Sequence, residues 1–205
     1  MAADFAPFLE PPCRTDGVLT GRLLLPAVKR FGREFAAVRA RVETESYKPP
    51  PGRDDPLSRW LSEPTEPEAE EPDDGTRPVL LGEGCKAPTA NQLVLAAWLV
   101  AHQEAVCDWI SRDGQAWYAD QRDDLAAPSA AYRDGLPFLP PAGDRAGSDG
   151  LRRVSEIHLA AAEWAIGLVT PCALFEGQPL GVCVRDGTEY ESGDDGVAYV
   201  SDDGP

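Results

Sequence analysis

Two short apolar segments near the N-terminus carry the hydrophobic pattern of paired strands. Residues 18–25 are mostly apolar and end at Pro26, which cannot donate a hydrogen bond to a strand ladder. Residues 38–43 alternate apolar and polar side chains, as a half-buried strand does. We expect the two segments to form an antiparallel pair. The connection between them, residues 29–33, holds the densest positive charge of the chain.

The clearest helical periodicity lies in the middle of the chain. Thr89 and Gln92 stand at the spacing of a capping box, in which each side chain bonds the backbone N–H of the other residue. Four apolar residues then recur at spacings of four, seven and four, which makes one stripe along a helix: Leu95, Leu99, Val106 and Ile110. The pattern predicts a helix over residues 89–111, interrupted at Gly114.

The last third of the chain returns to strand patterns. Residues 151–159 alternate, residues 164–169 are compact and apolar, and residues 180–185 and 188–191 flank the dipeptide Asp186-Gly187. Asp-Gly readily adopts the positive φ values of a two-residue hairpin turn. Residues 197–200 are expected to add a final strand. These patterns predict an α+β fold, with an antiparallel sheet from N- and C-terminal strands packed on one long central helix.

Residues 48–78 interrupt the pattern with repeated prolines and carboxylates. Proline prevents both helix and ladder pairing, and adjacent carboxylates repel one another. We therefore expect a flexible, disordered acidic Pro-rich loop inside a single α+β domain of residues 1–205. Residues 120–150 are also expected to be mostly loop, with a short structured piece near Tyr132.

The charge of the chain is strongly acidic. Nineteen Lys and Arg face 35 Asp and Glu, which gives a net charge of −16 and a sequence pI near 4.4. Such a surface attracts basic partners and repels nucleic-acid phosphates and anionic membranes, although surplus carboxylates also serve solubility alone. With neither a leader-like N-terminus nor an apolar run of roughly 18–20 residues, we expect a cytoplasmic protein that binds neither membrane nor nucleic acid.

The cysteines favour a reducing compartment. There are five of them, an odd number with no CxxC pair: Cys13, Cys85, Cys107, Cys172 and Cys183. We expect reduced, mostly buried thiols. Cys172 and Cys183 could face each other across neighbouring strands.

The sequence contains no recognisable catalytic, cofactor-binding or metal-binding motif. Residues 82–86, Gly-Glu-Gly-Cys-Lys, lack the spacer and the ending of a phosphate loop. The Asp-Asp-Gly segments at 194–196 and 202–204 miss the alternating ligands of an EF-hand. Only two histidines occur, His102 in the predicted helix and His158 in an alternating strand. If the protein were an enzyme with an unfamiliar site, these histidines and the cysteines would be the first suspects.

The order of segments resembles a bacterial domain family of unknown function that is associated with immunity proteins of polymorphic toxin and secretion systems. The resemblance lies in the N-terminal pair at 17–26 and 33–43, in the helix opening PTANQLVLAAWLVAHQEAV, and in the C-terminal segment CALFEGQPLGVCVRDGTEYESGDDGVAYV. It covers about half of the 205 residues. The chain departs from the family in residues 174–179 and in the long acidic insertion. The resemblance implies a protein that binds a toxin and supplies no catalytic residues.

Charge and resemblance together favour a cytoplasmic immunity or inhibitor protein that neutralises a basic toxin or effector through an acidic surface. The candidate contacts form two clusters, one in the insertion and one at the C-terminus: Glu66, Glu68, Glu70, Glu71, Asp73 and Asp74, and Asp194, Asp195, Asp202 and Asp203. The alternatives are a non-catalytic scaffold or assembly component and an enzyme with an unrecognised site.

Overall fold

A seven-stranded sheet forms the centre of the protein. The structure, a computed structural model, describes residues 5–46, 73–83, 85–126, 140–141 and 143–200. Within these ranges the strands lie in chain order: β1 (Cys13–Thr15), β2 (Val18–Leu24), β3 (Thr76–Glu83), β4 (Glu156–Leu159), β5 (Ala165–Cys172), β6 (Phe175–Arg185) and β7 (Glu189–Gly193). Neighbouring strands are antiparallel except β3 and β4, which run parallel. The predicted α+β class is confirmed.

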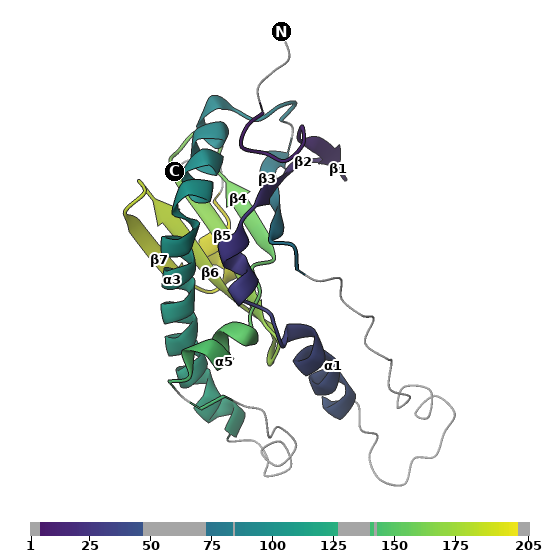
Figure 1. The fold of residues 1–205 in the computed structure, drawn as a ribbon, viewed down its shortest axis with the longest axis vertical. Helices are drawn as coiled ribbons and strands as arrows, with labels where there is room; N and C mark the ends of the chain where they lie inside the picture. The colour runs from purple at the N-terminus through teal and green to yellow at the C-terminus, as the bar shows by residue number, and fades with distance from the viewer. Residues whose placement is uncertain (1–4, 47–72, 84, 127–139, 142, 201–205) are drawn as a thin grey trace, which may run out of the picture.

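The long helix α3 (Ala90–Ala126) covers one face of the sheet (Figure 1). The four residues of the predicted stripe are all buried in the main core, where they pack with apolar side chains of β2 to β6. By length and composition alone, residues 90–120 are also apolar enough to cross a membrane. Burial against the sheet accounts for the four residues of the stripe, whereas other apolar residues of this segment, such as Val94, are exposed.

The start of α3 follows the predicted capping box. The Thr89 backbone N–H donates to Gln92 Oε1 at 3.0 Å, and the Gln92 backbone N–H donates to Thr89 Oγ1 at 3.2 Å. The predicted end was wrong, because the helix continues through Gly114 to Ala126. A Cβ at position 114 would lie 2.8 Å from Nε of the buried Arg152, so this glycine makes room for a side chain instead of ending the helix.

The predicted strand at residues 38–43 is wrong. These residues lie in helix α1 (Phe35–Ser46), which follows the short 3-10 helix η1 (Pro26–Arg30). Phe35 and Val38 are both buried in a second apolar cluster. Their spacing of three is helical, and alanine and arginine favour helix, so the short alternation of period two was misleading.

β2 pairs with β1 and with β3, which begins at Thr76, and not with residues 38–43. The predicted loop over 48–78 therefore extends too far, while its residues 48–72 lie outside the described ranges. The loop predicted over 120–150 is also partly wrong, because α3 reaches Ala126 and α5 spans Arg145–Gly150. Tyr132 lies outside the described residues.

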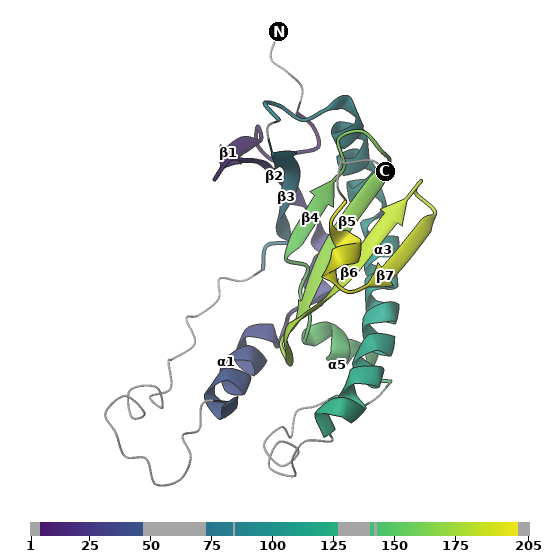
Figure 2. The same cartoon turned by 180° about the vertical axis from the view of Figure 1, so that it is seen from behind.

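The C-terminal strands agree with the sequence in part. Of the predicted segment 151–159 only Glu156–Leu159 forms a strand, while the segments at 164–169 and 180–185 lie within the longer strands β5 and β6 apart from Trp164. The predicted hairpin is confirmed as β6 and β7, with Asp186 at φ 51° and Gly187 at φ 73° in the turn. The strand predicted at 197–200 is wrong, because Val197 and Ala198 lie in a 3-10 helix, η2 (Asp195–Ala198), and Tyr199 and Val200 follow it outside any strand. This 3-10 helix packs on the face of the sheet opposite α3 (Figure 2).

The five cysteines are thiols, and no disulfide joins them. Cys172 lies opposite Phe175 and Cys183 lies opposite Gly167, so the expected juxtaposition of Cys172 and Cys183 is wrong. Burial raises the pKa of the Cys107 thiol to about 12, which leaves it protonated at neutral pH.

Candidate functional site

Of the predicted contact residues in the acidic insertion, the structure describes Asp73 and Asp74. Glu66, Glu68, Glu70 and Glu71 lie outside the described residues. The Asp73 carboxylate accepts hydrogen bonds from the Arg77 guanidinium and from the Gly75 backbone N–H at 2.8 Å. The hydrogen bond from Arg77 is the main reason that the pKa of Asp73 lies below its ordinary value. Asp74 accepts from the Thr76 backbone N–H at 2.6 Å. Both carboxylates thus stabilise the turn that leads into β3.

The C-terminal cluster is described at Asp194 and Asp195, whereas Asp202 and Asp203 lie outside the described residues. Asp194 precedes η2, and its backbone carbonyl accepts a hydrogen bond from the Val197 N–H at 3.1 Å. Asp194 is exposed and Asp195 is half-buried. The packing of η2 on β5 and β6 fixes both residues to the face of the sheet opposite α3.

Strand alternation adds three more carboxylates to the same face. Cys183 packs with Val197 on the η2 side, and Glu191 lies directly opposite Cys183 on β7, so Glu191 and Glu189 point to that side. On β4, Ile157 and Leu159 enter the main core beneath α3, and Glu156 therefore points to the η2 side. We name Glu156, Glu189, Glu191, Asp194 and Asp195 the acidic face.

Little positive charge offsets the acidic face. His158 is bonded to Glu156 at 3.3 Å, but burial lowers its pKa, so it is mainly neutral at pH 7. Arg185 forms an ion pair with Glu163 at 3.4 Å. Tyr199 lies edge-on to His158 and is 51% exposed. The acidic face therefore combines three exposed acidic residues, Glu189, Glu191 and Asp194, with the half-buried Glu156 and Asp195 and the aromatic ring of Tyr199.

The sequence could have indicated two of the three added carboxylates. Glu189 and Glu191 flank Tyr190 in the predicted hairpin strand, so a common side for them follows from the period of two. Their position next to Asp194 and Asp195 could not be predicted, because the pattern of residues 197–200 predicts a strand, whereas the structure has the 3-10 helix η2 at Asp195–Ala198. Glu156 is brought near by the order of β4 to β6, for which the sequence gives no signal.

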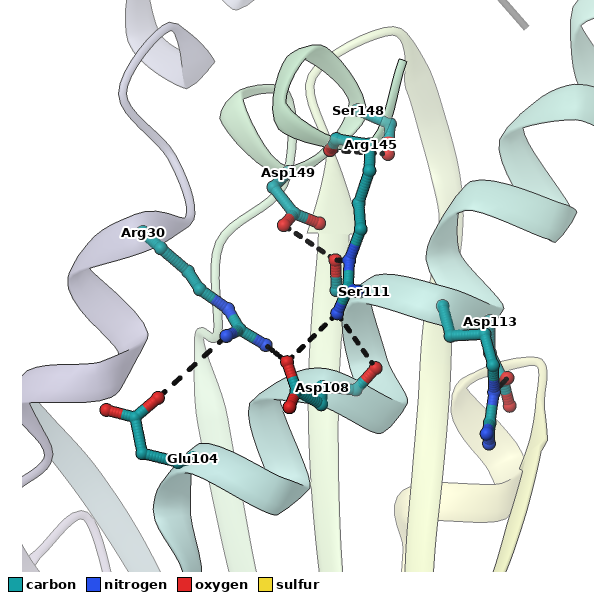
Figure 3. A network of polar contacts seen from close by, with 9 residues as sticks. Arg30, Glu104, Asp108, Ser111, Asp113, Arg145, Ser148 and Asp149 are labelled. Atoms are coloured by element: carbon teal, nitrogen blue, oxygen red, sulfur yellow. Dashed lines mark hydrogen bonds and ion pairs between the residues drawn. The ribbon is translucent and has the colours of Figure 1, made fainter. Parts of the chain in front are cut away.

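A second group of polar residues joins η1, α3 and α5 (Figure 3). Asp108 accepts from Arg30 at 3.1 Å and from Arg145 at 3.0 Å. Ser111 donates to Asp149 at 2.6 Å and accepts from Arg145 Nε at 2.6 Å. Ser111 is fully buried and both of its contacts lie inside this group, which leaves its hydroxyl without access to a substrate. The group fixes α5 against α3.

The two histidines lie on opposite sides of the sheet. His102 belongs to α3, where its ring stacks on Trp98 and its Nδ1 lies 2.8 Å from the Trp98 carbonyl oxygen. His158 belongs to β4 on the η2 side. Across the described ranges, no three His, Cys, Asp or Glu residues are placed to hold a metal ion. The structure thus does not bring the two histidines together into one site.

Asp149 offers a test of the group that joins η1, α3 and α5. Burial raises the pKa of its carboxyl above the ordinary value, against the opposing hydrogen bond from Ser111. A raised pKa favours folding below the unfolded-state value of 3.8, and this contribution is lost as pH rises through the folded-state value. The substitution Asp149→Asn removes the ionisation. We expect its stability relative to the natural protein to improve as pH rises from about 3.8, measured by urea unfolding between pH 3.5 and 7. A difference that is constant with pH would contradict this assignment.

Comparison with known protein families, with curated proteins and with solved structures found no match to this chain. The proposal that follows therefore depends on the surface chemistry of the molecule and on the resemblance in its sequence.

Proposed function

We propose that the protein is a cytoplasmic immunity or inhibitor protein, which binds and neutralises a basic toxin or effector without catalysis. The observation that supports this proposal is the acidic face. Its five carboxylates come from three separate elements, β4, β7 and the η2 segment, and they converge on one side of the sheet.

The chemistry of the acidic face suits rapid capture of a basic protein. Charge complementarity raises the association rate and penalises wrong partners, which an inhibitor of a toxic protein needs. The half-exposed Tyr199 ring supplies an aromatic contact of the type that dominates binding energy at many protein interfaces. Neutral His158 beneath it adds no repulsion towards a cationic partner at pH 7.

The scaffold alternative requires stable self-association, and the sheet edge at β7 is the obvious place for it. Glu189 and Glu191 are exposed on this strand. Pairing of two β7 strands would bring these like charges together, which opposes assembly through this edge. The same carboxylates are an advantage when the partner is basic.

We predict that neutralising four carboxylates of the acidic face weakens binding of the partner by roughly fourfold to several hundredfold, because each exposed charge contributes about 0.2–1 kcal/mol. The variant carries Glu189→Gln, Glu191→Gln, Asp194→Asn and Asp195→Asn. The tagged natural protein and this variant are used to capture partners from the native lysate at low and moderate salt, and the affinity of the recovered partner is then measured. The partner is expected to be one basic protein whose binding weakens as salt rises.

A matched control separates the acidic face from net charge. It neutralises four exposed carboxylates elsewhere: Glu10, Asp16, Glu34 and Glu104. This control should bind the partner with the affinity of the natural protein. It should also still protect cells that co-express the toxic partner. Equal loss of binding in both variants, or recovery of only the protein itself, would contradict the proposal.

A further inference from the structure

This acidic protein also has a cleft whose charged lining residues are mainly positive. The cleft lies between the η1–α1 connection, the start of β3 and residues 153–155. It has a volume of about 710 Å³, which is within the range of small-molecule sites. Four cations line it: Lys29, Arg33, Arg77 and Arg153. We name these four residues and the space between them the basic cleft.

The cleft results from the one parallel pairing in the sheet. β3 and β4 pair only at Val79 with Ile157 and at Leu80 with His158. Before these positions the two chains are not paired with each other. Thr76 to Pro78 pair with β2, and the backbone N–H groups of Arg153 and Ser155 donate to carbonyls of β5. The η1–α1 connection contributes Phe31, Gly32 and Arg33 to the lining of the cleft.

Gly32 shapes the wall of the cleft. Its φ of 80° lies in the left-handed region, which favours glycine. A Cβ there would lie 3.3 Å from the Arg152 carbonyl oxygen and from Arg153 Cβ. The absence of a side chain therefore lets the basic segment at 29–33 approach Arg153.

Two of the four cations, Lys29 and Arg33, form no ion pair within the described residues. Among the described lining residues, Asp73 is the single carboxylate, and the Arg77 guanidinium binds both of its oxygens. Arg77 is only 8% exposed, yet its Nε has no hydrogen-bond partner among the described residues. Lys29 and Arg33 are exposed at the rim, and the Arg153 guanidinium lies 4.8 Å from the centre of the Phe35 ring. The Arg77 Nε is closed to solvent, so the groups that can contact an anion in the cleft are the exposed side chains of Lys29, Arg33 and Arg153.

We infer that the basic cleft binds a small molecule that carries two or more phosphate groups. Two exposed cations without an ion pair, Lys29 and Arg33, lie beside Arg77 and Arg153, and this local excess of positive charge suits a ligand with several negative charges. Arginine in particular suits phosphate oxygens. Phe31, Phe35, Pro78 and Val154 form apolar lining beside the cations, which suits an organic group attached to the phosphates. The site is separate from the acidic face and does not depend on the proposed immunity function.

The test uses inorganic pyrophosphate as the probe, titrated calorimetrically into the full chain in a phosphate-free buffer at low ionic strength. The natural protein should bind pyrophosphate. The double variant Lys29→Gln, Arg33→Gln should bind it at least roughly tenfold more weakly, because two charge-assisted contacts are lost. Both residues are exposed, so the variant should keep the melting temperature of the natural protein.

The matched control is Arg112→Gln, Arg185→Gln, which removes two exposed cations away from the cleft and changes net charge by the same amount. Retention of pyrophosphate by this control supports the site. Three results would overturn it: no binding by the natural protein, equal weakening in the control, or citrate binding as tightly as pyrophosphate. Loss of the toxin partner in the acidic-face variant, with pyrophosphate binding unchanged, would keep the two proposals distinct.

Discussion

Replacing Gly167 with alanine is expected to destabilise the protein by about 3 kcal/mol or more, at the upper end of the range for overpacked interiors. A Cβ at this position would lie 1.7 Å from the Ala198 carbonyl oxygen and 2.6 Å from its carbonyl carbon. These are backbone atoms, so no rotamer change can relieve the collision. Either η2 must leave the sheet or β5 must distort.

Two further substitutions define the cause of this effect. Gly181→Ala should behave like Gly167→Ala, because its Cβ would lie 2.2 Å from the Asp194 carbonyl oxygen at the other end of η2. Gly196→Ala should be nearly neutral, within about 0.5 kcal/mol, because its Cβ would meet only the Asp194 side chain, at 3.0 Å. Urea unfolding measures all three, and hydrogen exchange of the η2 amides reports whether η2 detaches. A Gly167→Ala protein as stable as the Gly196→Ala protein would refute direct packing of η2 on the sheet.

The same glycines connect stability to the proposed function. Asp194 and Asp195 belong to the η2 segment, and Glu189 and Glu191 belong to the sheet on which η2 packs. The close approach at Gly167 and Gly181 therefore determines how the two halves of the acidic face are placed. A detached η2 would weaken partner binding even though every carboxylate remained.

Where the pattern was long and redundant, the sequence was sufficient to predict the fold. The stripe from Leu95 to Ile110 is buried as predicted, and Asp186-Gly187 forms the predicted turn. Where the pattern was short, tertiary contacts determined the secondary structure. Residues 38–43 fit a period of two, yet the packing of Phe35 and Val38 selects a helix.

Two glycines inside regular elements mark places where another part of the chain packs closely against the backbone. From the sequence, Gly114 predicts an interruption of the helix, and Gly167 is one residue of an apolar strand. In the structure Gly114 admits Arg152, whose guanidinium lies 4.7 Å from the centre of the Trp117 ring, and Gly167 admits η2. Glycine inside a strand often marks close backbone approach, but the element that approaches cannot be identified from sequence.

The candidate sites were less predictable than the fold. The sequence indicated the negative charge and the positive segment 29–33, since both are local in the chain. It could not place Arg77 and Arg153 beside that segment, because they are 44 and more residues away along the chain and are brought close by the parallel pairing of β3 with β4. The sequence also could not show that the Asp73 carboxylate is hydrogen-bonded to Arg77. That bond leaves the carboxylate less available to a binding partner.

Gln92 contributes to stability well beyond its predicted capping role. Its Nε2 donates to the Leu81 carbonyl at 2.7 Å and to the Leu159 carbonyl at 2.9 Å, at the ends of the parallel strands β3 and β4. Its Oε1 accepts from the Thr89 N–H, and the side chain is fully buried. One residue therefore joins the start of α3 to both strands. Gln92→Ala leaves these partners unsatisfied and opens a cavity, and we expect a loss of about 3–5 kcal/mol.

The isosteric change Gln92→Glu separates hydrogen bonding from packing. It preserves the volume but replaces the donor with an oxygen facing two carbonyl oxygens, so the loss at pH 8 should be as large as for Gln92→Ala. Burial should raise the pKa of the new carboxyl in the folded state, and stability is then retained at low pH and lost as pH rises through that value. Urea midpoints of both variants between pH 4 and 8 test this. If Gln92→Glu were as stable as the natural protein at pH 8, the two strand carbonyls would not depend on Gln92, and the junction of α3 with β3 and β4 would be held by apolar packing alone.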